Sequence, residues 1–151
     1  ALTGWSDDEK LSRSVTRIKD KRGTWTREVT LYKTDDVRLE VKDTLSRAGA
    51  VYWHLQGTPQ WGTNGVLLDV NGTKLQVSWE GAEGMTHRDV STWSAPDPLK
   101  RWCYSGDPDR EVKLSRSAEG TITTVFRGAG INYPVPSASP VGEYAPVDTN
   151  P

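Results

Sequence analysis

The stretch GVLLDVNGTKLQVSW, residues 65–79, decides the fold class of this 151-residue chain. Two runs rich in Val and Leu flank Asn71-Gly72, and Asn-Gly favours the left-handed backbone of a two-residue type I′ turn. After the turn Leu75, Val77 and Trp79 occupy every second position, as side chains on one face of a strand do. The segment therefore predicts an antiparallel β-hairpin.

The same period of two recurs along the chain. It is seen in TWTREVTLY (24–32), DVRLEVKDTL (36–45) and AVYWHLQ (50–56), and in the pair EVKLSRS and TITTVFRG around the turn AEG (118–120). MTHRDVSTW (85–93) is a weaker strand signal, and no run of about 12 residues carries a helical stripe. The expected inward-facing side chains are Trp25, Arg27, Val29 and Leu31; Val37, Leu39 and Val41; and Val51, Trp53 and Leu55.

These patterns predict an all-β domain over residues 1–132, an antiparallel β-sandwich of about eight to ten short strands. Residues 1–12 are polar and weakly patterned, so we expect a lead-in segment. Residues 94–110 hold three prolines and are expected to be an irregular excursion. Proline is too frequent for a sheet in residues 133–151, which predicts an extended Pro-rich C-terminal tail or interdomain linker.

Composition excludes several classes of function. A net charge of −1 argues against nucleic-acid binding, and no run approaches the roughly 18 apolar residues of a membrane span. Neither a phosphate-binding glycine motif nor a nucleophile-elbow motif occurs, so we expect no cofactor. Cys103 is the only cysteine and is expected to be a small buried hydrophobe. Ala1 suits a cut mature terminus or an excised domain, and we expect a secreted or periplasmic location.

Candidates for metal binding are few. His54, His87 and Cys103 lie far apart and lack a ligand-spacing motif, so we expect no metal site. The remaining alternative is that His54 and His87, one on each of two strands, meet in space, with Asp69 or Asp89 completing the site. His54 is a weak candidate for a catalytic base, because a base needs a positioned partner that the sequence does not reveal.

The composition is unusually rich in tryptophan, which is the most informative feature for function: the chain has seven Trp and five Tyr but one Phe. Indole and phenol rings stack on sugar rings and offer a polar edge. Trp25, Trp53 and Trp79 are in phase with aliphatic neighbours and are expected in the core. The other four either stack on sugar rings or fill the open edge of the sandwich: Trp5, Trp61, Trp93 and Trp102. The candidate ligand-binding residues of this kind are Trp61, Trp102, Trp93, Tyr104, Tyr52 and His54.

Basic residues cluster in SVTRIKDKRG, residues 14–23. Arg17, Lys19 and Arg22 are candidates for charge-assisted contacts with an acidic polysaccharide. The alternative is a solvated strand that ends in a charged turn.

The order of these features resembles the C-terminal β-sandwich of heparinase II/III-like polysaccharide lyases. The resemblance rests on RGTWTREVTLYKTDDVRLEVKDTLSRAGAVYWHLQG (22–57), the hairpin 65–79, and WCYSGDPDREVKLSRSAEGTITTVFRG (102–128). In the family a spacer separates a Trp from a His, whereas Trp53 and His54 are adjacent here. The resemblance therefore gives His54 no firm catalytic role.

The resemblance implies a function. In these lyases an acidic polysaccharide lies between a helical toroid and the β-sandwich, and a uronic acid loses its C5 proton before β-elimination. The toroid is absent from this chain. We therefore expect a non-catalytic domain of a polysaccharide-lyase-like protein that braces or lines the site, with a catalytic toroid domain as a missing partner. The alternatives are a free-standing carbohydrate-binding module and a protein-interaction module.

Overall fold

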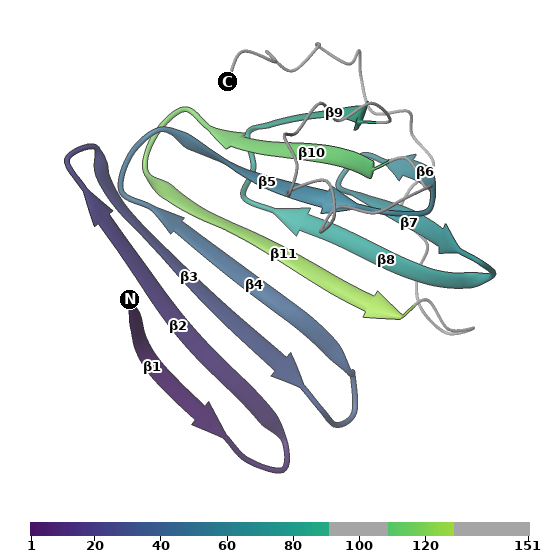
Figure 1. Ribbon diagram of the computed structural model, residues 1–151, viewed down its shortest axis with the longest axis horizontal. Coiled ribbons are helices and arrows are strands. Elements are labelled where there is room, and N and C mark those ends of the chain that lie inside the picture. Colours follow the sequence, from purple (N-terminus) through teal and green to yellow (C-terminus); the bar gives the residue numbers. More distant parts are fainter. Residues whose placement is uncertain (91–108, 129–151) are drawn as a thin grey trace, which may run out of the picture.

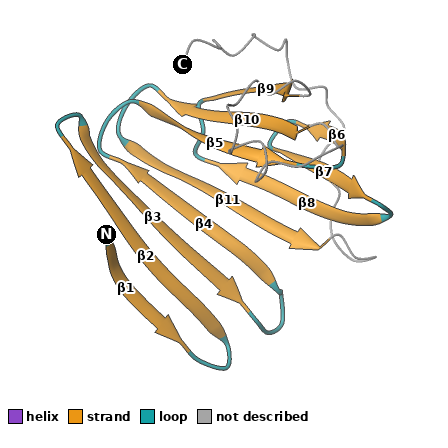
Figure 2. Ribbon diagram, in the orientation of Figure 1, coloured by secondary structure: helices purple, strands orange, loops and turns teal. Residues whose placement is uncertain are grey.

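A computed structural model describes residues 1–90 and 109–128. Within these residues the chain forms eleven strands and no helix (Figure 2). The strands are β1 (Leu2–Asp7), β2 (Leu11–Asp20), β3 (Gly23–Tyr32), β4 (Arg38–Leu45), β5 (Gly49–Leu55), β6 (Thr58–Gly62), β7 (Gly65–Val70), β8 (Thr73–Glu80), β9 (Gly84–Val90), β10 (Asp109–Arg116) and β11 (Gly120–Gly128).

The strands form two antiparallel sheets (Figure 1). The large sheet has the order β1-β2-β3-β4-β11-β8-β7-β6, and the small sheet has the order β5-β10-β9. The prediction of an all-β antiparallel β-sandwich is confirmed, with eleven strands in place of eight to ten. The tail and residues 94–108 of the expected Pro-rich excursion lie outside the described residues, whereas Asp109 and Arg110, expected to be irregular, begin β10.

The hairpin at residues 65–79 forms as predicted. β7 and β8 pair with Leu68 opposite Leu75 and Val70 opposite Thr73. Asn71 and Gly72 have φ values of 54° and 84°, the left-handed backbone that a type I′ turn requires. Gly72 has open space where a Cβ would lie, so its role in this turn is conformational.

The first residues differ from the sequence prediction. The expected lead-in segment contains β1, which pairs with β2 from Leu2 to Asp7 with an irregular register between Leu2 and Gly4. β1 forms one edge of the large sheet, and most of its side chains are exposed. A strand without a buried face needs no apolar alternation, so the periodicity that revealed the other strands is missing here.

The core lies between the small sheet and one part of the large sheet. Its buried side chains come from β5 and β10 on one side and from β7, β8 and β11 on the other: Val51, Leu55, Val112, Leu114, Val66, Leu68, Val77, Trp79 and Ile122. Trp53 crosses between the layers, since its Nε1 donates to Thr124 Oγ1 at 3.2 Å and its ring meets Phe126 edge-on at 5.0 Å. β1, β2 and β3 contribute nothing to this cluster.

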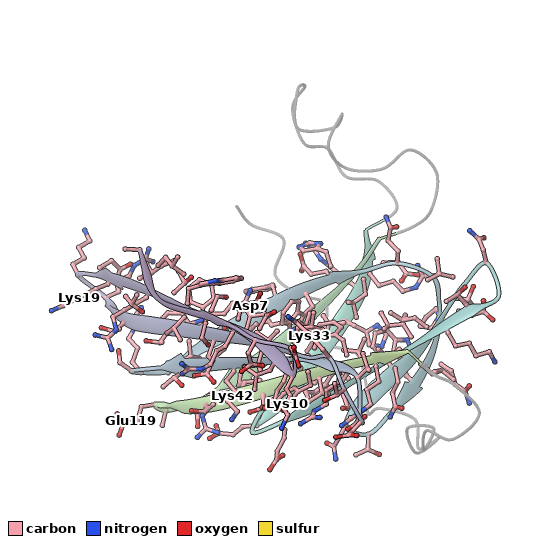
Figure 3. All side chains as sticks on the ribbon, turned by 90° about the horizontal axis from the view of Figure 1, so that it is seen from below. Asp7, Lys10, Lys19, Lys33, Lys42 and Glu119 are labelled. Carbon is pink, nitrogen blue, oxygen red and sulfur yellow. The ribbon has the colours of Figure 1, made fainter. Side chains whose placement is uncertain are left out.

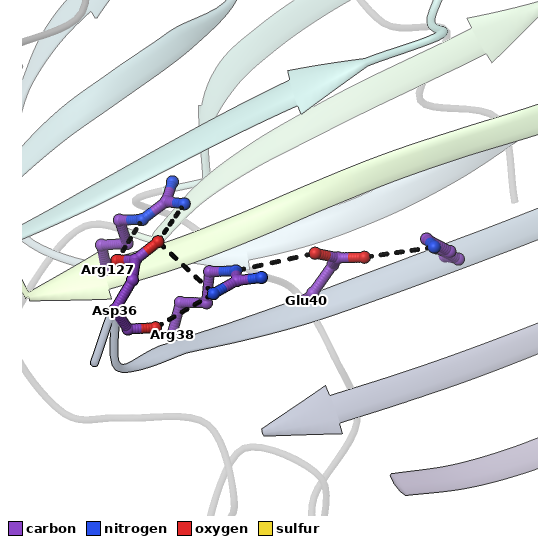
Figure 4. A network of polar contacts seen from close by, with 5 residues as sticks. Asp36, Arg38, Glu40 and Arg127 are labelled. Atoms are coloured by element: carbon purple, nitrogen blue, oxygen red, sulfur yellow. Dashed lines mark hydrogen bonds and ion pairs between the residues drawn. The ribbon is translucent and has the colours of Figure 1, made fainter. Parts of the chain in front are cut away.

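The opposite face of the large sheet carries a chain of ion pairs (Figure 4). Arg127 donates to both carboxylate oxygens of Asp36, at 3.1 and 2.9 Å, and Arg38 lies between Asp36 and Glu40. The hydrogen bond from Arg127 holds the pKa of Asp36 below its ordinary value. Positive and negative groups alternate along this chain, so it links the loop before β4 to β11 and leaves little net charge for a ligand.

No helix among residues 1–90 and 109–128 is long and apolar enough to cross a membrane.

Candidate functional site

A cleft opens where the edge of the small sheet meets the large sheet, beside the uncovered strands β2 and β3. Its volume is about 480 Å³. Three segments form its walls: the β2–β3 hairpin, the turn between β4 and β5, and the first half of β5. The lining residues include Ile18, Asp20, Arg22, Trp25, Arg27, Leu45, Arg47, Val51 and Tyr52.

Local hydrogen bonds fix the wall formed by the β2–β3 hairpin. The carboxylate of Asp20 accepts the backbone N–H groups of Arg22 and Gly23, at 2.7 and 3.1 Å, and these bonds lower the pKa of Asp20. Thr24 exchanges two bonds with Ser46: its N–H donates to Ser46 Oγ at 2.8 Å, and its carbonyl accepts the Ser46 N–H at 3.0 Å. The hairpin and the β4–β5 turn are therefore tied together at the mouth of the cleft.

Gly23 makes this junction possible. It has a φ of 148°, and a Cβ at this position would lie 2.7 Å from Ser46 Oγ. Any larger residue would displace the Ser46 hydroxyl, which accepts the Thr24 N–H.

A buried ion pair forms the floor of the cleft. Asp43 is fully buried and accepts bonds from Arg27 Nε at 2.7 Å, Arg27 Nη2 at 3.0 Å and Trp25 Nε1 at 2.8 Å. The guanidinium of Arg27 also lies 4.9 Å from the Trp25 ring centre and 4.8 Å from that of Trp53. Because Trp25 belongs to the large sheet and Trp53 to the small one, Arg27 joins the two layers at the border of the core.

The groups that remain available to a ligand are basic and aromatic. The Arg22 side chain is 71% exposed and its Nε lies 3.6 Å from Asp20 Oδ2, Arg47 is exposed, and Asp20 is the one carboxylate among the lining residues. The charge of Arg27 is balanced by Asp43. Tyr52 is 47% exposed, with Lys113 Nζ 5.9 Å from its ring centre on the outer face of the small sheet, and Trp25 is half-buried. Guanidinium groups pair with carboxylates and sulfates, and indole and phenol rings stack on sugar rings, so the cleft suits an acidic saccharide.

The basic residues predicted from the sequence lie on two faces. Arg22 lines the cleft. Arg17 and Lys19 pair across β2 and β3 with Thr26 and Thr24, on the face that points away from the cleft. Both are exposed, and Lys19 lies near the tip of the β2–β3 hairpin (Figure 3). Their predicted role in binding stays untested.

The tryptophans predicted for the core divide into two groups. Trp79 is buried, and Trp53 packs against the core cluster. Trp25 is half-buried outside that cluster and lines the cleft, which corrects the prediction. The alternation correctly placed Trp25 on the inner face, but the small sheet does not extend over this part of it.

The candidate platform Trp61 is half-buried and stacked on His87, with ring centres 3.6 Å apart and planes inclined by 7°. Burial lowers the pKa of His87 to about 4, so this ring is neutral near pH 7. One face of Trp61 is thus already occupied, and its predicted stacking on a sugar stays untested. The other candidates Trp93, Trp102 and Tyr104, and also Cys103, lie outside the described residues.

His54 lies on the outer face of the small sheet. Its Nε2 is 3.7 Å from the buried carboxylate of Glu111, which also accepts Arg88 Nε at 3.0 Å. Glu111 is the register partner of both His54 and Arg88, so β10 holds the carboxylate between the imidazole of His54 and the guanidinium of Arg88. Among residues 1–90 and 109–128, no group of three His, Cys, Asp or Glu side chains is placed to hold a metal ion.

Sequence reasoning missed the roles of Arg27 and Arg47. A signal for the first was present: Arg27 and Asp43 both occur in the inward phase of amphipathic strands, where a charge needs a partner. Arg47 sits in a turn between two strand patterns, and no periodicity marks it.

Comparison with known proteins identifies the fold. No family model matches the chain, and no curated protein matches it in sequence. Solved structures do match. The heparan sulfate lyase HepC from Pedobacter heparinus superposes with a TM-score of 0.61 at 15% identity, over 89% of this chain and 22% of that one. A heparinase III superposes with a TM-score of 0.59 at 16% identity, over 85% of this chain and 21% of the other.

The resemblance predicted from the sequence is thus confirmed as a shared fold. The chain has the fold of one part of these enzymes and spans only about a fifth of their length.

Proposed function

We propose that the chain, which shares its fold with part of solved heparan sulfate lyases, is a non-catalytic domain that binds an acidic polysaccharide in the cleft beside β5. It would serve a larger, secreted or periplasmic polysaccharide-lyase-like protein, bracing or lining its site. The observation that carries the proposal is the composition of the cleft: exposed Arg22 and Arg47 line it together with Trp25 and Tyr52.

Binding would use two kinds of contact. Arg22 and Arg47 approach the mouth of the cleft from different turns, so each can donate a forked pair of hydrogen bonds to a separate carboxylate or sulfate. The half-buried indole of Trp25 offers ring surface for the apolar face of a sugar. The Asp43–Arg27 pair holds Trp25 in position, because Asp43 accepts the indole N–H.

Binding without catalysis is favoured by the groups that line the cleft. Proton abstraction needs a base near the sugar, with a pKa near the operating pH. The carboxylate in the cleft is Asp20, whose pKa is lowered by backbone N–H groups. His54 belongs to the outer face of the small sheet and faces Glu111.

A titration tests this proposal directly. Tryptophan fluorescence of the whole chain is followed against heparan sulfate, alginate and neutral dextran, and the ultraviolet absorbance of unsaturated uronides is recorded in the same samples. We expect saturable binding of the acidic polymers that weakens with added salt, no binding of dextran, and no rise in absorbance. Rising absorbance would show a working lyase. If neither the fluorescence nor the absorbance changes with any acidic polymer, the proposal is wrong and the domain has a purely structural role.

A further inference from the structure

The cleft continues into an uncovered face of the large sheet. The register of β1, β2 and β3 places four exposed apolar side chains on this face: Leu2, 64% exposed; Trp5, 67%; Ile18, 48%; and Leu31, 40%. The face begins at the cleft, because Ile18 lines the cleft and is the register partner of Trp25. Figure 1 shows β1, β2 and β3 extending beyond the small sheet.

Trp5 lies at the far side of this face. It pairs with Ser14 on β2, four positions before Ile18. With a rise of about 3.3 Å per residue and a spacing of about 4.8 Å between strands, Trp5 and Trp25 are roughly 16 Å apart along the sheet. One sugar ring cannot reach both indoles, whereas a chain of several sugars can.

The side chains of β2 on this face, between the strands that carry the two indoles, bear hydroxyl groups. Ser14, the register partner of Trp5, and Thr16 precede Ile18 on the inner face of β2, opposite Val29 and Arg27 of β3, and both are half-buried. Hydroxyls donate and accept hydrogen bonds, as sugar hydroxyls do. Protein interfaces are depleted in serine relative to the rest of the surface, so this mixture suits a saccharide better than a docked protein.

We infer that Trp5 is a second stacking platform and that the ligand is an extended stretch of the acidic polysaccharide, running from the cleft across β2 to β1. The inference rests on the proposed function. The charged groups of the ligand pair with Arg22 and Arg47 at the cleft, and a sugar farther along the chain stacks on Trp5. A short oligosaccharide fills the cleft alone.

Oligosaccharides of defined length separate this inference from the proposed function. The affinity of the wild-type chain and of Trp5→Ala is measured for heparan sulfate disaccharides and decasaccharides by calorimetry. We expect Trp5→Ala to weaken decasaccharide binding about 5- to 30-fold and to leave disaccharide binding unchanged. Trp5→Phe should retain most of the decasaccharide affinity. Val70→Ala, which removes another exposed apolar side chain at the β7–β8 hairpin, should change neither.

Three results would overturn the inference. If the wild type and Trp5→Ala bind the decasaccharide with the same affinity, Trp5 is not part of the binding site. That result would still agree with the proposal that the cleft binds the ligand. Equal losses for both lengths would show that Trp5 does not act through a distant sugar. Self-association of the wild type that Trp5→Ala abolishes, with sugar affinity unchanged, would assign the face to protein contact. Failure of the wild type to bind any length would refute the proposed function itself.

Discussion

Replacement of Arg27 by methionine is expected to lower the free energy of unfolding by about 3–5 kcal/mol. The methionine fills a similar volume but leaves the fully buried carboxylate of Asp43 with only the Trp25 indole as a donor. The desolvation cost of the Asp43 carboxylate is then no longer offset by its attraction to the Arg27 guanidinium. The cation–π contacts with Trp25 and Trp53 are lost at the same time. Urea unfolding at neutral pH, followed by circular dichroism, measures the effect.

A matched control separates burial from charge. Arg13 pairs with Glu28 at 2.6 Å, but their side chains are 45% and 29% exposed, so Arg13→Met should cost less than about 1 kcal/mol. The double variant Arg27→Met/Asp43→Leu should recover much of the loss, because it removes the buried carboxylate together with its partner. Equal effects of Arg27→Met and Arg13→Met would contradict the structural role given to the buried pair.

Removal of both exposed guanidinium groups of the cleft, in Arg22→Ser/Arg47→Ser, is expected to weaken binding of heparan sulfate about 10- to 100-fold. Each charge-assisted contact with a carboxylate or sulfate contributes on the order of 1–2 kcal/mol, reduced by solvent screening at these exposed positions. Calorimetric titration at two salt concentrations checks the result, and the variant should also show a weaker dependence of affinity on salt.

Arg17→Ser/Lys19→Ser removes the same charge from the neighbouring face of β2, so it is the matched control for this double variant. We expect it to lower the affinity less than threefold, through the long-range field alone. A greater loss in this control than in Arg22→Ser/Arg47→Ser would place the ligand on the outer face, where the sequence-based prediction had included Arg17 and Lys19.

Much of the fold follows from local patterns in the sequence. Asn71-Gly72 specified its turn, and the alternation in residues 36–45 and 50–56 correctly placed the buried Val41, Val51 and Leu55 on the inner faces of β4 and β5. Val37, also expected to face inward, precedes β4 and is 51% exposed, which corrects that prediction. Alternation works at these positions because a strand packed on one side must be apolar at every second residue.

The cleft was less predictable, because it depends on how far one sheet extends over the other. Trp25 and Trp53 have the same kind of sequence environment, yet only Trp53 lies in a strand that packs on the core cluster. No local pattern records that the small sheet has three strands and the large one eight. The same limit applies to Arg47, which reaches the cleft only because Ser46 is tied to the β2–β3 hairpin.

The most direct test of the central claim is a nuclear magnetic resonance titration of the ¹⁵N-labelled chain with heparan sulfate oligosaccharides. The claim is that the ligand occupies the cleft beside β5. We expect the largest shifts at the Trp25 indole and at the backbone amides of residues 22–25 and 47–52, with small shifts at Arg17, Lys19 and His54. Shifts concentrated on those three residues, or the absence of any shift at the Trp25 indole on saturation, would contradict the claim.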